Sequence, residues 1–165
     1  MKRILTIAAA TCGLLAAAPA FAADYSVIHL ETTVDAPIEK TWAKVGGYCA
    51  IQDWIKRLAP CVMTGDGGVG SIRKLGATGA IVEVLVAATK YSYTYAQPNN
   101  MILYHGTLSA EAIDKGHTKL MYTLIYDQEP DGTPEAKDKD RAARTGNFTT
   151  ALANMKALAE GKPVP

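Results

Sequence analysis

One long helix-forming segment ends this chain, and it follows a series of segments that favour strands. After Pro134, apolar side chains recur at steps of three and four residues, the spacing of an amphipathic helix of about 25 residues. Gly161 and Pro163 end the segment. Since no other helical segment is as long, this helix is the only element able to cover one face of the sheet that the preceding strands form.

The strands are indicated by alternating apolar and polar side chains. In residues 25–34, Ile28 and Leu30 fall on one side of the chain and His29 on the other, the pattern of a half-buried strand. Six further segments are predicted as strands, which hairpin-length turns join into an antiparallel sheet. These segments are 61–64, 71–75, 80–88, 91–97, 102–112 and 118–126.

Two short helices are predicted between the first strand and the second. Asp35 is expected to cap the first helix, with Pro37 in its first turn. Gly46-Gly47 is expected to end it by adopting the left-handed conformation. The second helix is predicted over residues 48–58.

The predicted order is one strand, two short helices, six strands and a long helix, which is an α+β arrangement. Residues 24–161 are expected to form a single domain and 162–165 a short tail. A helix lying across a strongly curved sheet often leaves space beneath it. The order of elements therefore predicts a cavity between sheet and helix, and a cavity suits a ligand.

Residues 1–22 have the layout of a cleavable secretory signal. Lys2 and Arg3 precede an uncharged run, and Ala20-Phe21-Ala22 supplies the small-residue cleavage pattern. The run is about 15 residues long, shorter than the roughly 20 that a bilayer core requires. We therefore expect cleavage near Ala22, a periplasmic or secreted protein, and no stable membrane anchor.

The charge balance argues against nucleic acid as a partner. The chain has 17 Lys+Arg against 16 Asp+Glu. Loss of Lys2 and Arg3 with the leader would leave 15 against 16, a net charge near −1. Nucleic-acid binding requires a basic surface, so we do not expect it here.

Two cysteines, Cys49 and Cys61, remain after the predicted cleavage. We expect a disulfide between them, as an exported chain permits, and two buried free thiols are the alternative. Their spacing fits no zinc pattern, so no metal site is expected.

The motifs and their order resemble the START-like, or SRPBCC, superfamily, and within it the bacterial polyketide cyclase/dehydrase-like branch. The residues that carry the resemblance are Asp35-Ala36-Pro37, Trp42, Gly47-Tyr48-Cys49, Trp54, Cys61, residues 70–75, 81–85 and 91–95, and the terminal helix. The resemblance implies the helix-grip fold, in which a curved seven-stranded antiparallel sheet wraps around a long C-terminal helix. Related sequences often carry His and Pro after the tryptophan, whereas Ile55 and Lys56 follow Trp54 here.

The resemblance also implies an apolar cavity for a small hydrophobic molecule. Members of the superfamily bind lipids, sterols, polyketides or plant hormones, and some are aromatases or cyclases. No cofactor is implied.

Arg73 and Glu83 form the first candidate site. They lie in successive strands joined by a tight turn, so they could face each other across the ladder. If they point into the cavity, they offer charged groups that can hydrogen-bond to a ligand carbonyl or carboxylate. The alternative is a salt bridge with a structural role.

Aromatic and apolar side chains form the second candidate set. Tyrosine combines a flat apolar body with one hydroxyl, which suits an amphipathic ligand, although ordinary packing is the alternative. The tyrosine candidates are Tyr93, Tyr95, Tyr104 and Tyr122. The other cavity candidates are Trp54, Phe148, Leu152 and Met155, of which the last three are expected to face the sheet from the terminal helix.

The sequence is compatible with three functions. The first is a periplasmic binding protein for a lipid, an isoprenoid or an aromatic polyketide-like molecule, held in a closed apolar cavity. The second is a cyclase or dehydratase acting in the same cavity, although no catalytic motif is present in the sequence. The third is an envelope module that binds a protein partner and has a filled core.

Overall fold

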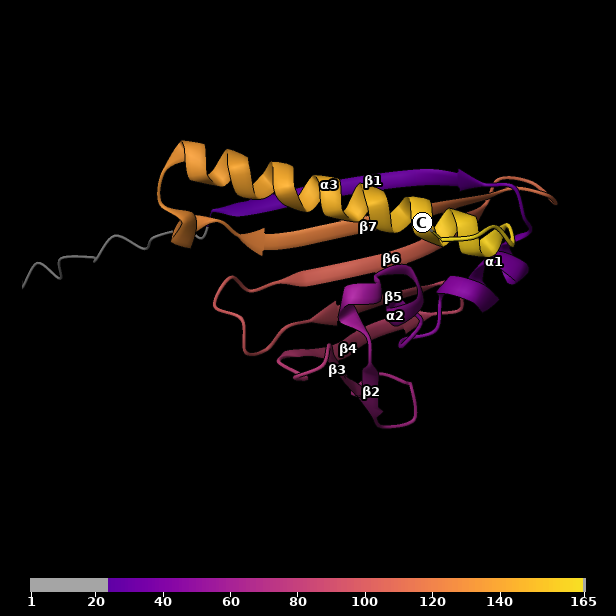
Figure 1. Cartoon of the computed structure of the whole chain (residues 1–165), viewed down its shortest axis with the longest axis horizontal. Helices are drawn as coiled ribbons and strands as arrows, with labels where there is room; N and C mark the ends of the chain where they lie inside the picture. Colours follow the sequence, from indigo (N-terminus) through magenta and orange to yellow (C-terminus); the bar gives the residue numbers. More distant parts are fainter. Residues whose placement is uncertain (1–23, 165) are drawn as a thin grey trace, which may run out of the picture.

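The computed structural model describes residues 24–164, and its elements follow the predicted order (Figure 1). The predicted leader, residues 1–22, lies outside the described residues. The strands are β1 (Tyr25–Val34), β2 (Cys61–Thr64), β3 (Ile72–Leu75), β4 (Ile81–Thr89), β5 (Ser92–Ala96), β6 (His105–Ala112) and β7 (Thr118–Asp127). The helices are α1 (Ile38–Val45), α2 (Ile51–Trp54) and α3 (Pro134–Ala159), with the 3-10 turns η1 (Lys56–Leu58) and η2 (Glu129–Asp131).

All seven strands form one antiparallel sheet in the order β1-β7-β6-β5-β4-β3-β2. Strands β2 to β7 pair in chain order, as hairpin-length turns dictate. Strand β1 pairs instead with β7, so α1, α2 and η1 carry the chain from one edge of the sheet to the other. The α+β helix-grip fold predicted from the sequence is confirmed.

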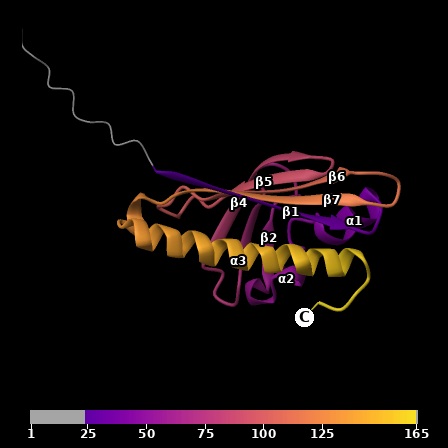
Figure 2. The same ribbon diagram turned by 90° about the horizontal axis from the view of Figure 1, so that it is seen from above.

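The long helix α3 and the short helix α2 lie on the same side of the sheet (Figure 2). Thr133 caps α3 by accepting a hydrogen bond from the Ala136 backbone N–H at 3.2 Å. The buried residues of α3 all lie in its C-terminal half: Ala151, Leu152, Met155 and Ala159. The N-terminal half of α3 therefore packs less closely on the sheet than its C-terminal half.

No helix among residues 24–164 is long and apolar enough to cross a membrane.

Two predictions about α1 are wrong. Asp35 does not cap the helix, because Pro37 takes the cap position and no side chain caps it. Gly46 ends the helix in a right-handed conformation, with φ −83° and ψ −11°, not the left-handed one expected. Close packing requires glycine there, since a Cβ atom would lie 2.2 Å from the Trp42 ring.

The predicted second helix is shorter than expected. It ends at Trp54 because Ile55 is extended, with φ −127° and ψ 83°, and the turn η1 follows. This break places Lys56, Arg57 and Leu58 on a separate turn beside α3.

The expected disulfide joins Cys49 to Cys61, whose Cα atoms are 5.6 Å apart. It ties the segment before α2 to the start of β2 across 12 residues of sequence.

We expect the Cys49→Ser/Cys61→Ser variant to lose about 3 kcal/mol of unfolding free energy, because closing a loop of this size restricts the unfolded chain. Urea denaturation of both proteins measures the loss. Equal midpoints would contradict the prediction.

Glu160, just after α3, ties the end of this helix to the start of the fold. Its Oε1 accepts a hydrogen bond from the Asp35 backbone N–H at 3.0 Å, and Lys156 and Lys162 lie 2.9 and 2.6 Å from its carboxylate. The Asp35 bond and then the Lys162 bond lower the pKa of Glu160 from 4.5 to about 2. A lowered pKa stabilises the fold above pH 4.5, and this stabilisation is lost as the pH falls toward 2.

Glu160→Gln should therefore destabilise the protein by about 1–2 kcal/mol at neutral pH, the scale of hydrogen bonds to a charged group. The difference from wild type should shrink as the pH falls from 4.5 toward 2, which urea denaturation across that range measures. Glu111→Gln is the control, since it removes only an exposed ion pair with Lys119. A deficit that is the same at every pH would show that the charge is not responsible.

Candidate functional site

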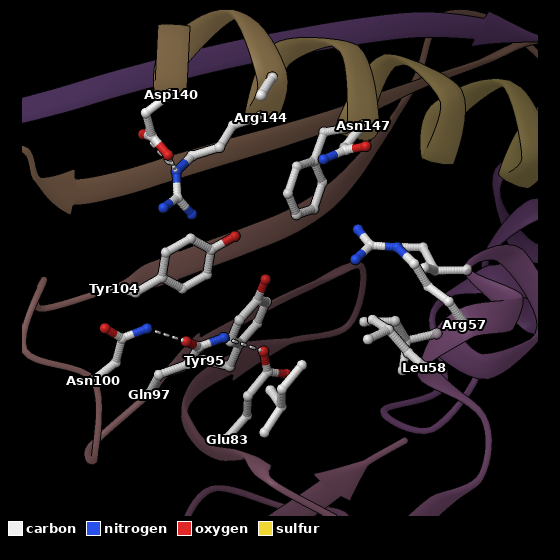
Figure 3. A pocket seen from close by; sticks show the side chains of 15 residues that line it. Arg57, Leu58, Glu83, Tyr95, Gln97, Asn100, Tyr104, Asp140, Arg144 and Asn147 are labelled. Carbon is white, nitrogen blue, oxygen red and sulfur yellow. Dashed lines mark hydrogen bonds and ion pairs between the residues drawn. The ribbon is translucent and has the colours of Figure 1, made fainter. Parts of the chain in front are cut away.

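A groove of about 430 Å³ lies between α3, the α2–η1 segment and strands β4 and β5 (Figure 3). We call it the α3 groove. It is partly open to solvent and lies where α3 packs less closely on the sheet. Sequence reasoning predicted a cavity between sheet and helix, but expected it to be closed and apolar. The groove is instead open on one side and has distinct apolar and polar parts.

The apolar part of the groove comes from its two helical sides. Ile51, Ile55 and Leu58 line it from the α2–η1 segment, and Ala143 and Phe148 from α3. The Phe148 ring also packs on Tyr122, with ring centroids 4.7 Å apart. These side chains offer a surface for a ring or a short hydrocarbon chain.

The polar part is a chain of hydrogen bonds along the floor. The Asn100 side-chain amide donates to Gln97 Oε1 at 2.7 Å, and the Gln97 amide donates to Glu83 Oε1 at 2.9 Å. Both bonds are visible in Figure 3. The other Glu83 oxygen, Oε2, accepts from Arg73 Nε at 2.6 Å. The polar floor is thus connected to a buried cation in the core.

Arg73 is fully buried beneath the groove. As predicted, it faces Glu83 across the β3–β4 ladder, and Nη2 lies 2.6 Å from Glu83 Oε2. Its Nη1 donates to the Tyr48 backbone carbonyl. Its guanidinium carbon lies 4.2, 4.8 and 5.7 Å from the ring centroids of Tyr48, Tyr95 and Tyr93. Arg73 does not line the groove, so of this pair only Glu83 is placed to meet a ligand.

Tyr95 and Tyr122 share a hydrogen bond between their hydroxyls at 2.8 Å. The Tyr95 ring lies against Gly106 on the neighbouring strand, where a Cβ atom would come within 2.4 Å of it. A side chain at position 106 would therefore displace the ring. Burial raises the pKa of both tyrosines well above the usual value, so both stay protonated at neutral pH.

Charged side chains at the rim of the groove differ in their pairing. Arg144 Nε donates to the Asp140 carboxylate at 2.8 and 3.0 Å, and its guanidinium stacks 4.3 Å from the Tyr126 ring centroid. Arg57, by contrast, forms no hydrogen bond or ion pair through its side chain with any residue in 24–164. In Figure 3 its guanidinium extends from η1 toward α3.

The structure brings together four of the predicted site residues in the groove: Glu83, Tyr95, Tyr104 and Phe148. Arg73 and Tyr122 lie beneath the floor, and Leu152 and Met155 pack in the core. Tyr93 lies beside Tyr95 on β5 but does not line the groove; it lines a smaller hollow with Trp42 and Tyr48. Trp54 lines a second hollow, beside the groove.

Sequence reasoning missed the polar residues of the groove. Gln97 and Asn100 lie in and beside a turn, where amide side chains are expected for local reasons. Arg144 could have been found, since it lies four residues before Phe148 and so shares its helix face. No sequence pattern indicated that Arg57 lines the groove, because its position depends on the end of α2 at Trp54 and the start of η1 at Lys56.

No three His, Cys, Asp or Glu side chains in the described part of the chain converge as a metal site.

Comparison with known families settles the relationship. The model of the family described as polyketide cyclase / dehydrase and lipid transport matches residues 27–160. The chain belongs to this family. The resemblance to the SRPBCC superfamily and its polyketide cyclase-like branch is therefore confirmed. A search of curated proteins found no match.

Solved structures share the polyketide cyclase-like fold at low sequence identity. A solution structure from Thermobifida fusca has a TM-score of 0.66 and 21% identity, covering 83% of this chain and 97% of its own. The di-domain ARO/CYC protein BexL of the BE-7585A biosynthetic pathway has a TM-score of 0.64 and 15% identity, covering 84% and 51%. Norcoclaurine synthase from Thalictrum flavum, in complex with dopamine and hydroxybenzaldehyde, has a TM-score of 0.61 and 16% identity, covering 89% and 95%.

The contribution of the Arg73–Glu83 pair to the stability of the groove floor can be tested directly. Arg73→Met should destabilise the protein by about 3–5 kcal/mol, because it leaves the Glu83 carboxylate buried without its cation. Arg73→Met/Glu83→Gln should recover part of this loss, since the glutamine is neutral and can still accept from Gln97. Urea denaturation of the wild type, both single variants and the double variant measures the coupling. A double variant whose loss equals the sum of the two single losses would show that the pair is not coupled.

Proposed function

We propose that this protein binds a small hydrophobic or amphipathic molecule, of the lipid, isoprenoid or aromatic polyketide class, in the α3 groove. The observation that carries the proposal is the division of the groove into two parts. Side chains such as Ile55 and Phe148 form an apolar part, and the hydrogen-bonded side chains of Glu83, Gln97 and Asn100 form a polar floor. A ligand with an apolar body and one polar group matches both parts. The volume of about 430 Å³ falls in the range typical of small-molecule sites.

Two further observations support a binding role. The family description includes lipid transport. A structure of similar fold, norcoclaurine synthase, is in complex with two small aromatic molecules. A partner-binding module with a filled core was the third possibility, and the groove does not fit that expectation.

The proposed location is the periplasm or the outside of the cell. The signal-like residues 1–22 support it, as does the disulfide between Cys49 and Cys61, since disulfides persist in oxidising compartments.

A cyclase or dehydratase activity is the second candidate, and the Glu83 carboxylate favours it because it faces the groove together with Tyr104. Burial raises the pKa of Tyr104, so its hydroxyl is a hydrogen-bond donor and not a base. Both Glu83 oxygens already accept hydrogen bonds, from Arg73 and Gln97. This arrangement suits the orientation of a ligand better than the removal of a proton from it.

Blocking the groove tests the binding role. Ala143 is exposed and lines the groove, so Ala143→Trp should fill it and weaken binding of an apolar fluorescent probe such as phenylnaphthylamine at least about tenfold, the cost of losing its buried contacts. Ala142→Trp is the matched control, because Ala142 is the adjacent exposed residue and does not line the groove. Fluorescence titration gives both affinities.

Equal binding by the two variants would place the probe elsewhere and overturn the proposal. Native mass spectrometry of the protein, expressed with its own leader and purified after export, would then identify any molecule that co-purifies. Conversion of that molecule on incubation with fresh protein would favour the enzyme over the carrier.

A further inference from the structure

A second hollow, of about 260 Å³, lies between η1 and the middle of α3. It shares Ile55, Arg57 and Asn147 with the α3 groove, so the two spaces meet at Arg57. We call the region around this shared residue the Arg57 junction. The proposed function uses only the α3 groove and leaves the second hollow without a role.

The charged side chains that line the second hollow are both cations, Lys56 and Arg57. Neither forms an ion pair or a side-chain hydrogen bond with another residue in the described part of the chain. The two carboxylates of the neighbouring groove are engaged elsewhere, Asp140 with Arg144 and Glu83 with Arg73. The junction therefore carries two cations that form no ion pair in the described part of the chain.

The other polar side chains that line the second hollow are neutral. They are Asn147, Thr150 and Asn154, all from α3. Since no carboxylate lines this hollow, nothing on its wall repels an anion. Trp54 also lines the hollow and is fully buried. Asn154 fixes this residue in place by donating from its amide to the Trp54 carbonyl at 2.9 Å.

We propose that the Arg57 junction binds the anionic end of the ligand whose apolar body occupies the α3 groove. The ligand class is therefore an anionic amphiphile, with a carboxylate, sulfonate or phosphate group next to a ring or a short chain. Arginine is suited to this role because its fork of N–H donors matches two oxygens of such a group. This inference rests on the proposed function and narrows it to ligands that carry a negative charge.

Two probes that share an apolar body test the inference. Anilinonaphthalene sulfonate carries one negative charge, and phenylnaphthylamine has a similar ring system without it. We expect the wild-type protein to bind the sulfonate about tenfold more tightly, the scale of one hydrogen-bonded charge pair. Raising NaCl from ~0.1 M to ~1 M should reduce this preference, because salt screens an exposed pair.

Arg57→Gln should weaken binding of the sulfonate about fivefold to tenfold and leave binding of the uncharged probe within about twofold. Adding Lys56→Gln should remove the remaining preference. Lys115→Gln is the matched control, since Lys115 is an exposed cation in the turn after β6 and lines neither hollow. Urea denaturation of each variant verifies that the fold is retained.

The outcomes separate the two proposals. If both probes bind the wild type equally and Arg57→Gln changes neither, the anionic class is wrong and the α3 groove remains a binding site. An equal loss of both probes in Arg57→Gln would assign Arg57 to packing and also overturn the inference. If neither probe binds the wild type, the proposed function falls, and the role of the Arg57 junction falls with it.

Discussion

One buried ion pair, Arg73–Glu83, connects several distant parts of this fold. Arg73 is removed from water entirely, and a buried guanidinium is tolerated only where acceptors and rings replace its hydration. Glu83, the Tyr48 carbonyl and tyrosine rings supply them, from β4, the segment before α2 and β5. These parts of the chain must come together in one arrangement for the charge to be satisfied. The Cys49–Cys61 disulfide holds the same region covalently.

The groove follows from this arrangement together with the shape of α3. Only the C-terminal half of the helix has fully buried side chains, and Arg144 and Phe148, near its middle, face an open space. Tyrosines fill much of the interior below, where Tyr95 and Tyr122 satisfy each other's hydroxyls. The space that remains is bounded by the α2–η1 segment, whose break after Trp54 creates a separate turn beside α3.

The chemistry of the groove favours holding a ligand over transforming it. Its carboxylate at Glu83 is fully engaged, and its tyrosines are held protonated by burial, so the floor offers donors and an orienting dipole but no free base. The family to which the chain belongs covers both cyclases and lipid transport, so membership alone does not separate these roles. The unpaired cation Arg57 adds a feature that neither role requires, and it distinguishes ligands by charge. An amphiphile bound this way would have its anionic end toward η1 and its body against Phe148.

The sequence by itself determined the order of the elements, the α+β fold class and the pairing of Arg73 with Glu83, because strand alternation, turn residues and hairpin lengths act over short stretches of chain. It also supplied part of the site, since Glu83, Tyr95, Tyr104 and Phe148 all line the groove. Backbone rules failed where side-chain packing took precedence. Gly46 is glycine because the Trp42 ring lies against it, and not for the helix-ending conformation that its position suggested. Only the tertiary structure decided where the groove opens and that Arg57 lies beside α3, because both depend on the distance between segments about a hundred residues apart, which no local pattern records.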